Sequence, residues 1–493
     1  MPAPIQMDVQ VLLVDDLLDQ LREAIGAANV LHGVGLEPYR HDATFLDAEP
    51  RAAVLPGTTE EVAAIVRVCA AAGLPLVPRG AGSSLVGGSV PLGGGVVISM
   101  ERFNQLEIDP SNLCAVAGAG VITAKLNAAA AEHGLMYPPD PASVEICSIG
   151  GNVACNSGGM HSVKYGVTAD YVIGLTVVMA DGRIQRLGGR LRKRAAGYRL
   201  MQLFVGSEGT LGIITEVIVR LVPMPAAYAT AVVGFRSLDD AAAGVTRLFR
   251  SGHLPAALEL IDRSALDLMK EHLPQANEPG LSSVLIVEQD GIDEDHVLAQ
   301  MLRMVQALEG CADWIAQSPA ERFKIWSARR KLGHILTERP DNFFAEDIGV
   351  PIGAIPEMAK RLSKLSAATG LTIALFGHAG DGNLHPTILF SDAQRSMVGG
   401  AAARILRDAL ELGGTISAEH GLGALKRDFA EEELGSEAMD LMRRIKSLLD
   451  PRGILNPHKV FPEQPANEHF LDAQPGWMQP AGNGVRRHSE LGG

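Results

Sequence analysis

The sequence predicts an α+β protein with two large parts, the second of which holds an antiparallel sheet with flanking helices. Three observations support this fold class. Glycine-rich blocks occur three times within the first 215 residues, next to predicted strands and helices. The segment Pro223-Met224-Pro225 then marks a boundary. Beyond it, predicted strands and helices segregate as they do when an antiparallel sheet carries helices.

The composition indicates a globular protein and narrows its partners. Hydrophobic residues make up 47% of the 493 residues, which suits two or three domains with sizeable cores. The net charge of −14 argues against a nucleic-acid-binding surface. The five cysteines include no C-x-x-C pair, so we expect reduced thiols and no cysteine-ligated iron–sulfur cluster. No long apolar run or signal pattern is present, so we expect a cytoplasmic protein that is not transmembrane.

The first sharp pattern begins near residue 51, after residues 1–45, which we expect to be helical and peripheral. Residues 52–55 form a predicted strand, and Thr58 with Glu61 forms a capping box that opens a helix ending at Gly73. A second strand at residues 74–77 completes a β-α-β unit. The ends of such strands are where open α/β sheets tend to bind ligands.

The loop at residues 78–88, PRGAGSSLVGG, occupies that strand end. Its glycines reach positive φ without strain, so successive backbone N–H groups can point toward one centre. Converging N–H groups form an anion nest, which suits a phosphate or pyrophosphate. A tight glycine turn between strands is the alternative interpretation of this loop taken alone.

Two further glycine-rich blocks follow, at residues 138–159 and 206–215. Before the first of them, residues 118–120 imitate half of a Rossmann fingerprint. No strand that ends in an acidic ribose ligand follows at the expected distance, which argues against that fingerprint. The loop at residues 78–88 and the block at residues 138–159 are both of the phosphate-binding type. Two such loops in one chain indicate a large ligand held from two sides, a dinucleotide rather than a mononucleotide.

Together the three blocks resemble the FAD domain of the vanillyl-alcohol oxidase and p-cresol methylhydroxylase superfamily. Within it, residues 51–462 are most similar to the flavin subunit of glycolate oxidase and to D-lactate and D-2-hydroxyglutarate dehydrogenases. The resemblance implies a two-part FAD-binding domain of the p-cresol methylhydroxylase type at residues 46–225 and a substrate or cap domain at 226–430. A C-terminal segment at 431–465 would return to the flavin. Residues 466–493 show little apolar periodicity, so we expect a mobile tail.

The resemblance also implies which residues hold the cofactor, with the first loop cradling the FAD pyrophosphate. The implied cofactor-binding residues are Pro78, Arg79, Gly80, Ala81, Gly82, Ser83, Ser84, Pro139, Ser143, Gly150, Gly151, Asn152, Ala154, Glu208, Gly209, Ile214 and Asn456. The first loop contains no histidine, so we expect FAD to be bound without a covalent link.

A run of cations lies between the second and third blocks. It comprises Arg183, Arg186, Arg190, Arg192, Lys193, Arg194 and Arg199. One interpretation is a solvated hairpin edge. The other is a docking patch for an acidic electron acceptor or for an anionic membrane surface.

The second half concentrates chemistry-bearing side chains at two glycine-rich places. His378 ends a predicted strand, residues 379–382 turn, and His385 lies on the next strand, two residues after Asn383. Two imidazoles brought together across a turn suit a metal, and Glu419 can supply a carboxylate. Two histidines and one carboxylate leave coordination positions open, as in catalytic metal sites. The alternative interpretation is that these are ordinary polar residues at strand ends.

The family resemblance implies that His378, His385 and Glu419 bind a divalent metal, Zn or Mn. It implies that His420 is the catalytic acid/base that takes the proton of the substrate hydroxyl, while the hydride on C2 passes to flavin N5. Glu419 and His420 are neighbours, so both reach one site only if the backbone bends there. Gly421 permits this bend.

Three further residues are expected to bind substrate. Arg329 lies in a segment that resembles the family's W-A-x-R segment, whose arginine pairs with the substrate carboxylate. Asn383 lies beside the histidines, and Lys459 belongs to the C-terminal stretch that resembles the one folding back near the flavin.

The substrate class is narrowed by one departure from the family pattern. Hydroxyglutarate dehydrogenases place a lysine where Ala345 stands here, next to Glu346. An acidic neighbour would repel a second substrate carboxylate. This favours a monocarboxylate such as glycolate, D-lactate or a longer D-2-hydroxy acid.

The sequence thus predicts an FAD- and metal-dependent dehydrogenase that oxidises a D-2-hydroxy acid to the 2-oxo acid. D-2-hydroxyglutarate dehydrogenase is one alternative. A non-redox transferase of the alkyl-dihydroxyacetone-phosphate synthase type is another, although its histidine run is not found. Electrons must leave through a separate acceptor: a quinone, an electron-transferring flavoprotein or an iron–sulfur subunit. Such an acceptor could hold the protein peripherally at a membrane, and a homodimer is one candidate assembly.

Overall fold

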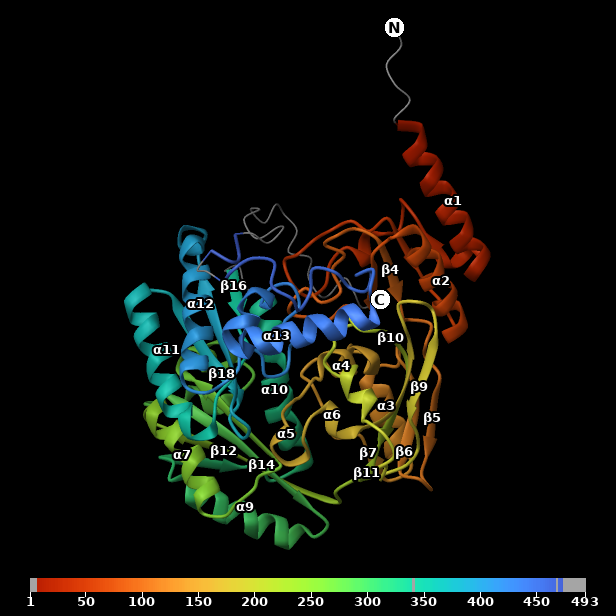
Figure 1. The fold of residues 1–493 in the computed structure, drawn as a ribbon. Helices are drawn as coiled ribbons and strands as arrows, with labels where there is room; N and C mark the ends of the chain where they lie inside the picture. The colour runs from red at the N-terminus through yellow and green to blue at the C-terminus, as the bar shows by residue number, and fades with distance from the viewer. Residues whose placement is uncertain (1–6, 339–341, 467–468, 473–493) are drawn as a thin grey trace.

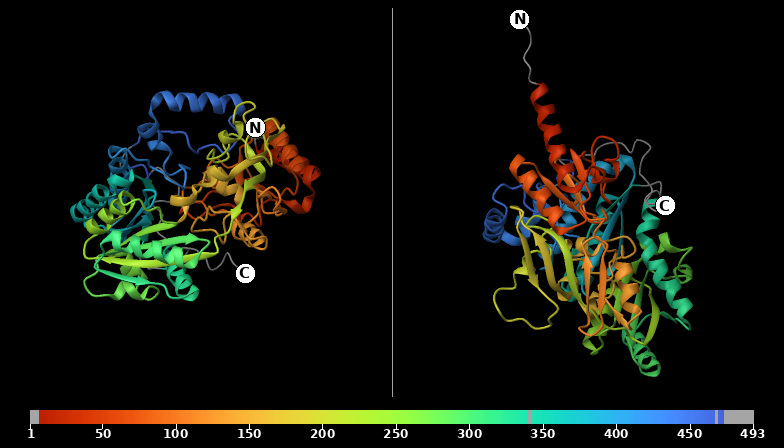
Figure 2. Two further views of the ribbon diagram at one scale, coloured as in Figure 1. Left: turned by 90° about the horizontal axis from the view of Figure 1, so that it is seen from below. Right: turned by 90° about the vertical axis from the view of Figure 1, so that its right-hand side faces the viewer.

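The computed structural model describes residues 7–338, 342–466 and 469–472, which fold into two halves lying side by side (Figure 1). The first half ends with β11 (Val222–Pro223), and the second, the cap, begins with β12 (Ala227–Phe235). Helix α13 (Ala430–Leu449) then runs from the cap toward the first half, as Figures 1 and 2 both show. This is the predicted α+β arrangement.

A four-stranded sheet opens the first half. Its order is β1 (Val30–Leu31), β2 (Ala52–Val54), β4 (Val96–Ser99), β3 (Leu76–Arg79), and the last three strands are parallel. Helix α2 (Thr59–Ala72) crosses from β2 to β3 and packs against α1 (Met7–Ile25). It begins where the Thr58 hydroxyl accepts a hydrogen bond from the Glu61 amide (3.1 Å) and ends at Gly73, whose φ of +65° is left-handed. The predicted β-α-β unit is therefore confirmed.

A five-stranded antiparallel sheet completes the first half. Its order is β5 (Leu106–Asp109), β6 (Cys114–Gly118), β10 (Ile213–Arg220), β8 (Val172–Val178), β9 (Ile184–Gly188). The helices between its strands are α3 (Thr123–Ala131), α4 (Ile149–Cys155), α5 (Ser162–Tyr165) and α6 (Thr168–Tyr171). A short pair joins β7 (Leu135–Met136) to β11. One hydrophobic core is shared by both larger sheets, α1 and α2.

The cap is built on one large sheet whose neighbouring strands pair antiparallel. Its order is β15 (Ala312–Ile315), β12, β14 (Ser283–Gly291), β13 (Ala257–Asp262), β18 (Thr372–His378), β19 (Asn383–Phe390), β16 (Asn342–Ala345), with β17 (Ile348–Gly349) also paired to β19. Helices α7 (Leu238–Arg250), α9 (Glu294–Leu308), α11 (Ile355–Thr369) and α12 (Arg395–Glu411) share a core with one face. Helices α8 (Arg263–Met269) and α10 (Pro319–Glu338) pack on the other. The predicted sheet with flanking helices is confirmed.

The alternation of side chains along the cap strands decides where its polar groups point. Because successive side chains alternate between faces, Glu259 shares a face of the sheet with Ile261, which packs in the core beneath α8 and α10. His378 of β18 and His385 of β19 project from the same face of the sheet as Glu259. Met160 of the first half packs into that core too. The face that carries the polar residues therefore turns toward the first half.

The expectation of a peripheral helical segment at residues 1–45 needs correction beyond Ile25, where α1 ends. Strand β1 joins the first sheet, and Tyr39 is buried against Ala53 and Val77. The amide of Ala43 donates a hydrogen bond to a carbonyl of the first glycine loop (3.1 Å). This segment therefore packs on the predicted phosphate loop, because its apolar side chains complete a small core there.

The tail expected to be mobile, residues 466–493, lies mostly outside the described residues. Phe470 and Leu471 are described, and both are buried in the core of the cap. The ring of Phe470 meets that of Phe429 edge-to-face, with centroids 5.0 Å apart. For these two residues the expectation is wrong. Among the described helices, none combines the length and apolar character needed to span a bilayer.

Candidate active site

Two of the glycine-rich loops meet in the structure. Gly80 of the first loop lies so close to the second that a Cβ on it would be 2.3 Å from the Ser148 hydroxyl. That hydroxyl accepts a hydrogen bond from the Gly151 amide (3.3 Å) and caps α4. A cavity of about 400 Å³ opens beside Gly80 and Ala81 and is also lined by residues 120–122. Residues that follow strands of both sheets therefore line one cavity beside the first loop.

The side chain of Arg79 supports the first loop from behind. Its Nη1 donates hydrogen bonds to the His41 carbonyl (2.7 Å) and to the Ser89 hydroxyl (3.2 Å). Burial lowers the pKa of Arg79, although the nearby Asp42 carboxylate raises it. The guanidinium is therefore used within the protein, which leaves the backbone of the loop to face a ligand.

The other predicted cofactor residues surround the same loops. Pro139 is buried, Ser143 lies in the turn before α4, and Ile214 is buried in β10. Gly150, Asn152 and Ala154 belong to α4, and a Cβ on Gly209 would lie 3.0 Å from Pro78. Pro78 and Arg79 are the last two residues of β3, and Gly82, Ser83 and Ser84 continue the first loop. Asn456 donates hydrogen bonds to the carbonyls of Gly88 (3.0 Å) and Glu208 (2.7 Å). The C-terminal segment therefore does return to the first loop.

Glu208 connects the first half to the predicted catalytic loop. Its two carboxylate oxygens accept hydrogen bonds from the backbone amides of Leu422 (2.8 Å) and Gly423 (2.7 Å). Burial raises the pKa of Glu208, and these two hydrogen bonds oppose that rise. The side chain predicted to bind cofactor is thus directed at the loop that follows His420.

Three imidazoles converge on one carboxylate oxygen at the ends of β18 and β19. The Nε2 atoms of His378, His385 and His420 lie 3.3, 3.5 and 3.8 Å from Oε1 of Glu419. The rings of His378 and His385 meet edge-to-face, whereas those of His385 and His420 stack at 9°. The structure therefore brings together the three predicted metal ligands and the predicted base.

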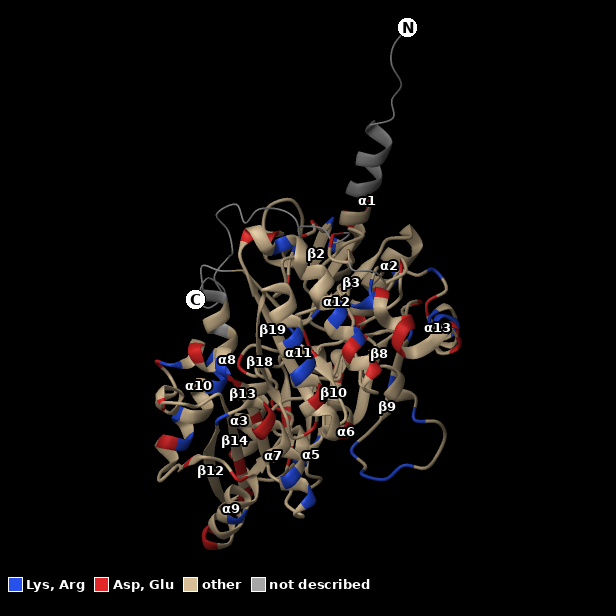
Figure 3. Cartoon of the chain, turned by 90° about the vertical axis from the view of Figure 1, so that its left-hand side faces the viewer, with Lys and Arg blue, Asp and Glu red and all other residues tan. Residues whose placement is uncertain are grey.

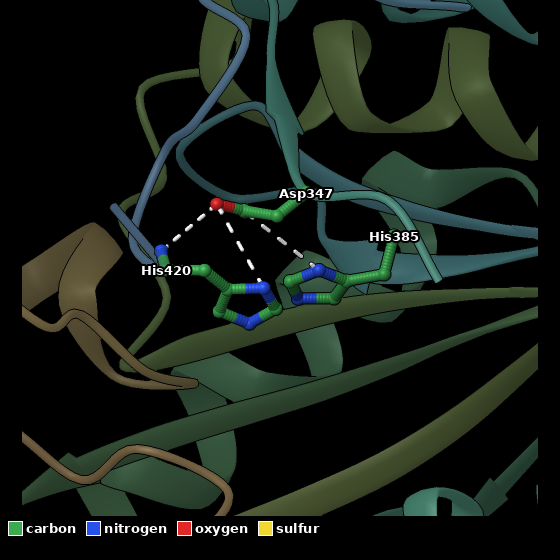
Figure 4. Close-up of side chains that lie close together, drawn as sticks. All are labelled: Asp347, His385 and His420. Carbon is green, nitrogen blue, oxygen red and sulfur yellow. Dashed lines mark hydrogen bonds and ion pairs between the residues drawn. The ribbon is translucent and has the colours of Figure 1, made fainter. Parts of the chain in front are cut away.

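The predicted backbone bend is present and has a cause that the sequence analysis missed. Gly421 has a φ of +85°. Oδ2 of Asp347 accepts hydrogen bonds from the consecutive amides of Glu419 (3.0 Å) and His420 (2.9 Å) and from the Ser417 hydroxyl (2.9 Å). Asp347 also lies 4.0 Å from Nδ1 of His420, as Figure 4 shows. This buried carboxylate turns two neighbouring side chains toward one point.

A second buried carboxylate, Glu259, supports His378. Its Oε1 accepts a 2.5 Å hydrogen bond from Nδ1 of His378, and its Oε2 lies 2.7 Å from Nε and 2.6 Å from Nη2 of Arg329. With Nδ1 so engaged, the free nitrogen of His378 is Nε2, the atom that faces Glu419. In metal sites, a carboxylate that accepts a hydrogen bond from one ring nitrogen of a histidine fixes the orientation of that ring. Arg329 reaches the site, but one edge of its guanidinium is taken.

The electrostatics of the histidines differ with their partners. Burial by itself lowers the pKa of His378, but the carboxylates of Glu259 and Glu419 raise it well above the usual value. Burial and the neighbouring His378 charge lower the pKa of His385 to about 3. Burial alone would raise the pKa of Asp347, whereas the His420 charge holds it below its usual range. His385 is therefore neutral and offers a nitrogen lone pair.

The donor set fits a divalent cation. Oε2 of Glu419 is buried without a hydrogen-bond partner among the described residues, so this carboxylate keeps an oxygen that can bind an ion. Ligand atoms bound to one ion at about 2.1 Å lie roughly 3.0–3.5 Å apart, close to the spacing between Oε1 of Glu419 and the nearest imidazole nitrogens. Asp347 also forms a compact group with His385 and His420, but both its oxygens already accept hydrogen bonds. His378, His385 and Glu419 are therefore the better ligand set.

Two predicted substrate residues are used within the protein. The side-chain amide of Asn383 donates to Asp347 (2.7 Å) and to the Ile348 carbonyl (3.1 Å). Lys459 is buried, donates to the Val90 carbonyl (2.9 Å), and has its pKa lowered by burial to about 8. The structure brings Asn383 into the histidine group. It places Lys459 at the first glycine loop instead.

A cavity of about 460 Å³ connects the histidine group to the first half. Glu419 and Asn383 line it from the cap, and Gly158, Gly159 and Ser162 line it from the segment after α4. A Cβ on Gly158 would lie 3.0 Å from Oε2 of Glu419. The segment that follows the second glycine-rich loop therefore borders the candidate metal site.

Known proteins share this architecture and are similar in sequence to this chain. Residues 50–188 match the FAD binding domain family, and residues 224–460 match the family of FAD linked oxidases, C-terminal domain. The glycolate oxidase subunit GlcD of Bacillus subtilis is 40% identical over 460 residues, which cover 91% of this chain and 97% of that protein. The chain belongs to the FAD-linked oxidase family.

Other members and related structures agree with this assignment. A D-lactate dehydrogenase of Anaerostipes hadrus is 35% identical, with 90% of this chain and 97% of that protein covered. Among solved structures, p-cresol methylhydroxylase superposes with a TM-score of 0.75 at 18% identity, covering 91% of this chain and 97% of that one. The predicted family and the two-part FAD domain with a cap are thus confirmed, and this FAD-linked oxidase binds FAD.

Sequence reasoning missed Asp347 and Glu259 in this FAD-linked oxidase. Glu259 is a carboxylate flanked by Leu258 and Leu260 in the buried strand β13, which is a signal that a buried partner is needed. Asp347 follows Glu346 directly, and the neighbouring sequence does not show which of the two carboxylates contacts the histidines. Glu346 is buried and pairs with Lys426 (3.0 Å). The argument that Glu346 repels a second substrate carboxylate therefore loses its basis, because the charge of Lys426 balances it.

Proposed function

We propose that this FAD-linked oxidase oxidises a D-2-hydroxy acid to the 2-oxo acid, using non-covalent FAD and a divalent metal, Zn or Mn. The observation that supports the proposal most is the convergence of three imidazole nitrogens on Glu419 beside a cavity shared with the FAD-binding half. The relatives named glycolate oxidase and D-lactate dehydrogenase act on 2-hydroxy acids by name. Glycolate, D-lactate or a related acid is therefore the proposed substrate.

The chain's own residues divide the work in this proposal. When bound, the flavin accepts a hydride and a divalent cation lowers the pKa of a hydroxyl group. His420 takes the hydroxyl proton at Nε2, the nitrogen on the side of Glu419. Its side chain is the most exposed of the group, at 20%, so a substrate can reach it. Asp347 holds His420 through the backbone and faces its Nδ1.

Arg329 contributes in two ways in the proposal. Its Nε and Nη2 bind Glu259 and so orient His378, while Nη1 forms no hydrogen bond with another described residue and is left for a substrate carboxylate. Glu259 occupies the Nε edge of the guanidinium, so a substrate carboxylate would meet the opposite edge, where Nη1 and Nη2 each present an N–H.

D-2-hydroxyglutarate is the second candidate substrate, and one observation favours it. The pairing of Glu346 with Lys426 removes the negative charge that argued against a dicarboxylate. The electrons leave to a separate acceptor, for which we propose a quinone, an electron-transferring flavoprotein or an iron–sulfur subunit.

Anaerobic reduction of the bound flavin tests the substrate. Glycolate, both enantiomers of lactate and both of 2-hydroxyglutarate are added to the purified protein, and bleaching of the flavin is recorded. We expect bleaching by glycolate and by D enantiomers. Bleaching by L enantiomers alone, or by none of the acids, contradicts the proposal.

Chelation tests the metal. Treatment with EDTA should leave the flavin spectrum unchanged, remove a stoichiometric metal detectable by elemental analysis, and slow flavin reduction. Added Zn²⁺ or Mn²⁺ should restore the rate. Release of flavin by EDTA, or an unchanged rate after metal removal, would show that the cation does not act where we place it.

A further inference from the structure

The loop between β9 and the turn Leu200–Leu203 projects away from the body of the protein, as the right-hand view of Figure 2 shows. Every residue from 191 to 200 is exposed. Tyr198 is 92% and Leu191 is 65% exposed, and Leu200 is exposed as well. Large apolar side chains on a projecting loop cost free energy in water, so their exposure indicates a surface that is covered in use.

The same loop carries the run of cations found in the sequence. No Asp or Glu occurs between Asp181 and Glu208, although the net charge of the chain is −14. At the base of the loop, Arg190 pairs with Glu107 and Asp109. At its tip, Arg192, Lys193, Arg194 and Arg199 form no ion pair with any carboxylate of the described residues. In Figure 3 this loop is coloured blue and tan, carries no red segment and projects from the body of the protein.

We propose that this loop, residues 190–200, docks the protein on an anionic phospholipid bilayer. Cations alternate with exposed Leu191 and Tyr198, the combination that binds the headgroup region: tyrosine and leucine enter the interface while arginine and lysine meet the lipid phosphates. A narrow projecting loop enters lipid without a matching surface, whereas a protein partner needs about 800 Å² of complementary contact per side. The observations therefore favour lipid over an acidic protein. The inference does not depend on the proposed substrate.

Vesicle binding tests the proposal with the full-length holoprotein. Vesicles of phosphatidylcholine alone are compared with vesicles that also contain phosphatidylglycerol. The protein should sediment only with the anionic vesicles, and raising ionic strength from about 0.1 to about 1 M should release it, because the Debye length falls from about 10 to about 3 Å. A triple variant, Arg192→Gln with Lys193→Gln and Arg194→Gln, should bind roughly 100-fold more weakly.

A matched control removes the same charge elsewhere. Arg303→Gln with Lys360→Gln and Lys364→Gln changes three exposed cations on α9 and α11 of the cap, and it should bind vesicles like wild type. Both triple variants should keep flavin reduction by hydroxy acid in solution, which separates this test from the proposed function.

Insertion is tested at Tyr198. In a Tyr198→Trp protein, brominated lipid in anionic vesicles should quench extra tryptophan emission relative to wild type. Three results would overturn the proposal: the wild-type protein does not bind anionic vesicles, the two triple variants bind them with equal affinity, or brominated lipid quenches no more emission in the Tyr198→Trp protein than in wild type. Each of these results would indicate a solvated loop or a site for an acidic protein.

Discussion

Gly82 and Gly73 both adopt a left-handed backbone, yet a side chain would collide with another group at only one of them. Gly82 has a φ of +71°, and a Cβ there would lie 2.1 Å from Nη2 of Arg79. Gly73 has a φ of +65° and has no atom within 4 Å of such a Cβ. The two positions therefore separate backbone strain from damage to the first glycine loop.

Gly82→Val should abolish FAD binding, because the side chain would displace Arg79 from His41 and so distort the loop that Arg79 supports. Gly73→Val should cost about 1–2 kcal/mol of folding stability through its backbone alone and keep its flavin. Flavin per protein and urea denaturation measure both effects. Full flavin content in Gly82→Val would mean that the pyrophosphate lies elsewhere.

Neighbouring residues Glu419 and His420 should respond differently to alanine. His420→Ala should slow flavin reduction roughly 10²–10⁴-fold, the usual range for losing an acid–base group, with metal content unchanged. Glu419→Ala should lose metal and activity together, because the converging imidazoles lose their only shared carboxylate oxygen among the described residues. Rapid-mixing kinetics and elemental analysis give the two readouts. Loss of metal from His420→Ala would make that residue a ligand and leave the base to be found.

At the scale of elements, the strands and helices followed from local signals in the sequence. The capping residue Thr58 and the terminal Gly73 fixed α2, and the strand predicted at residues 52–55 matches β2 to within one residue. The two histidines were found because one turn joins their strands. Asp347 and Glu259 escaped because their partners are distant in sequence: Glu259 meets His378 119 residues later and Asp347 meets His420 73 residues later. No local pattern encodes such a contact.

The contact of Glu208 with the loop after His420 gives a prediction that differs from a cofactor role. Glu208→Ala should leave Leu422 and Gly423 without acceptors, loosen the catalytic loop, and lower both metal affinity and the rate of flavin reduction, while FAD stays bound. Glu216→Ala, on the neighbouring strand β10, is the control and should alter neither. Loss of flavin from Glu208→Ala, with metal binding intact, would restore the cofactor role predicted from the sequence.

At the scale of the whole molecule, a buried ionic group joins the two halves. His161 of the first half lies between Asp140 (2.8 Å) and Glu288 of the cap (3.3 Å), and Arg322 pairs with Glu288 (2.7 Å). Burial lowers the pKa of His161, but the two carboxylates outweigh it and raise the pKa to about 10. Burial would raise the pKa of Glu288, yet His161 and Arg322 lower it to about 2. The imidazolium therefore bridges the halves at neutral pH.

This bridge predicts a pH-dependent contribution to stability. Because the folded pKa of His161 is raised, its contribution is complete below the ordinary value of 6.5 and disappears as pH rises through about 10. His161→Gln should therefore be less stable than wild type at pH 6, and the two should converge near pH 10. Chemical denaturation at several pH values measures this, with His296→Gln, at an exposed position of α9, as the control. A constant difference across this range would show that His161 does not titrate as described.

The return of the C-terminal segment to the first glycine loop has a consequence for how the chain folds during its synthesis. Leu455 pairs with Leu76 beside β3, and Asn456 and Lys459 bond to carbonyls of residues 88 and 90. A ribosome adding about 5–20 residues per second needs roughly 20–75 s to make the residues between these partners. Throughout that interval the amino-terminal half lacks the C-terminal segment, so the first glycine loop has none of its contacts with Asn456 and Lys459. The nascent chain cannot hold FAD in its final setting until the segment around Leu455 has been made.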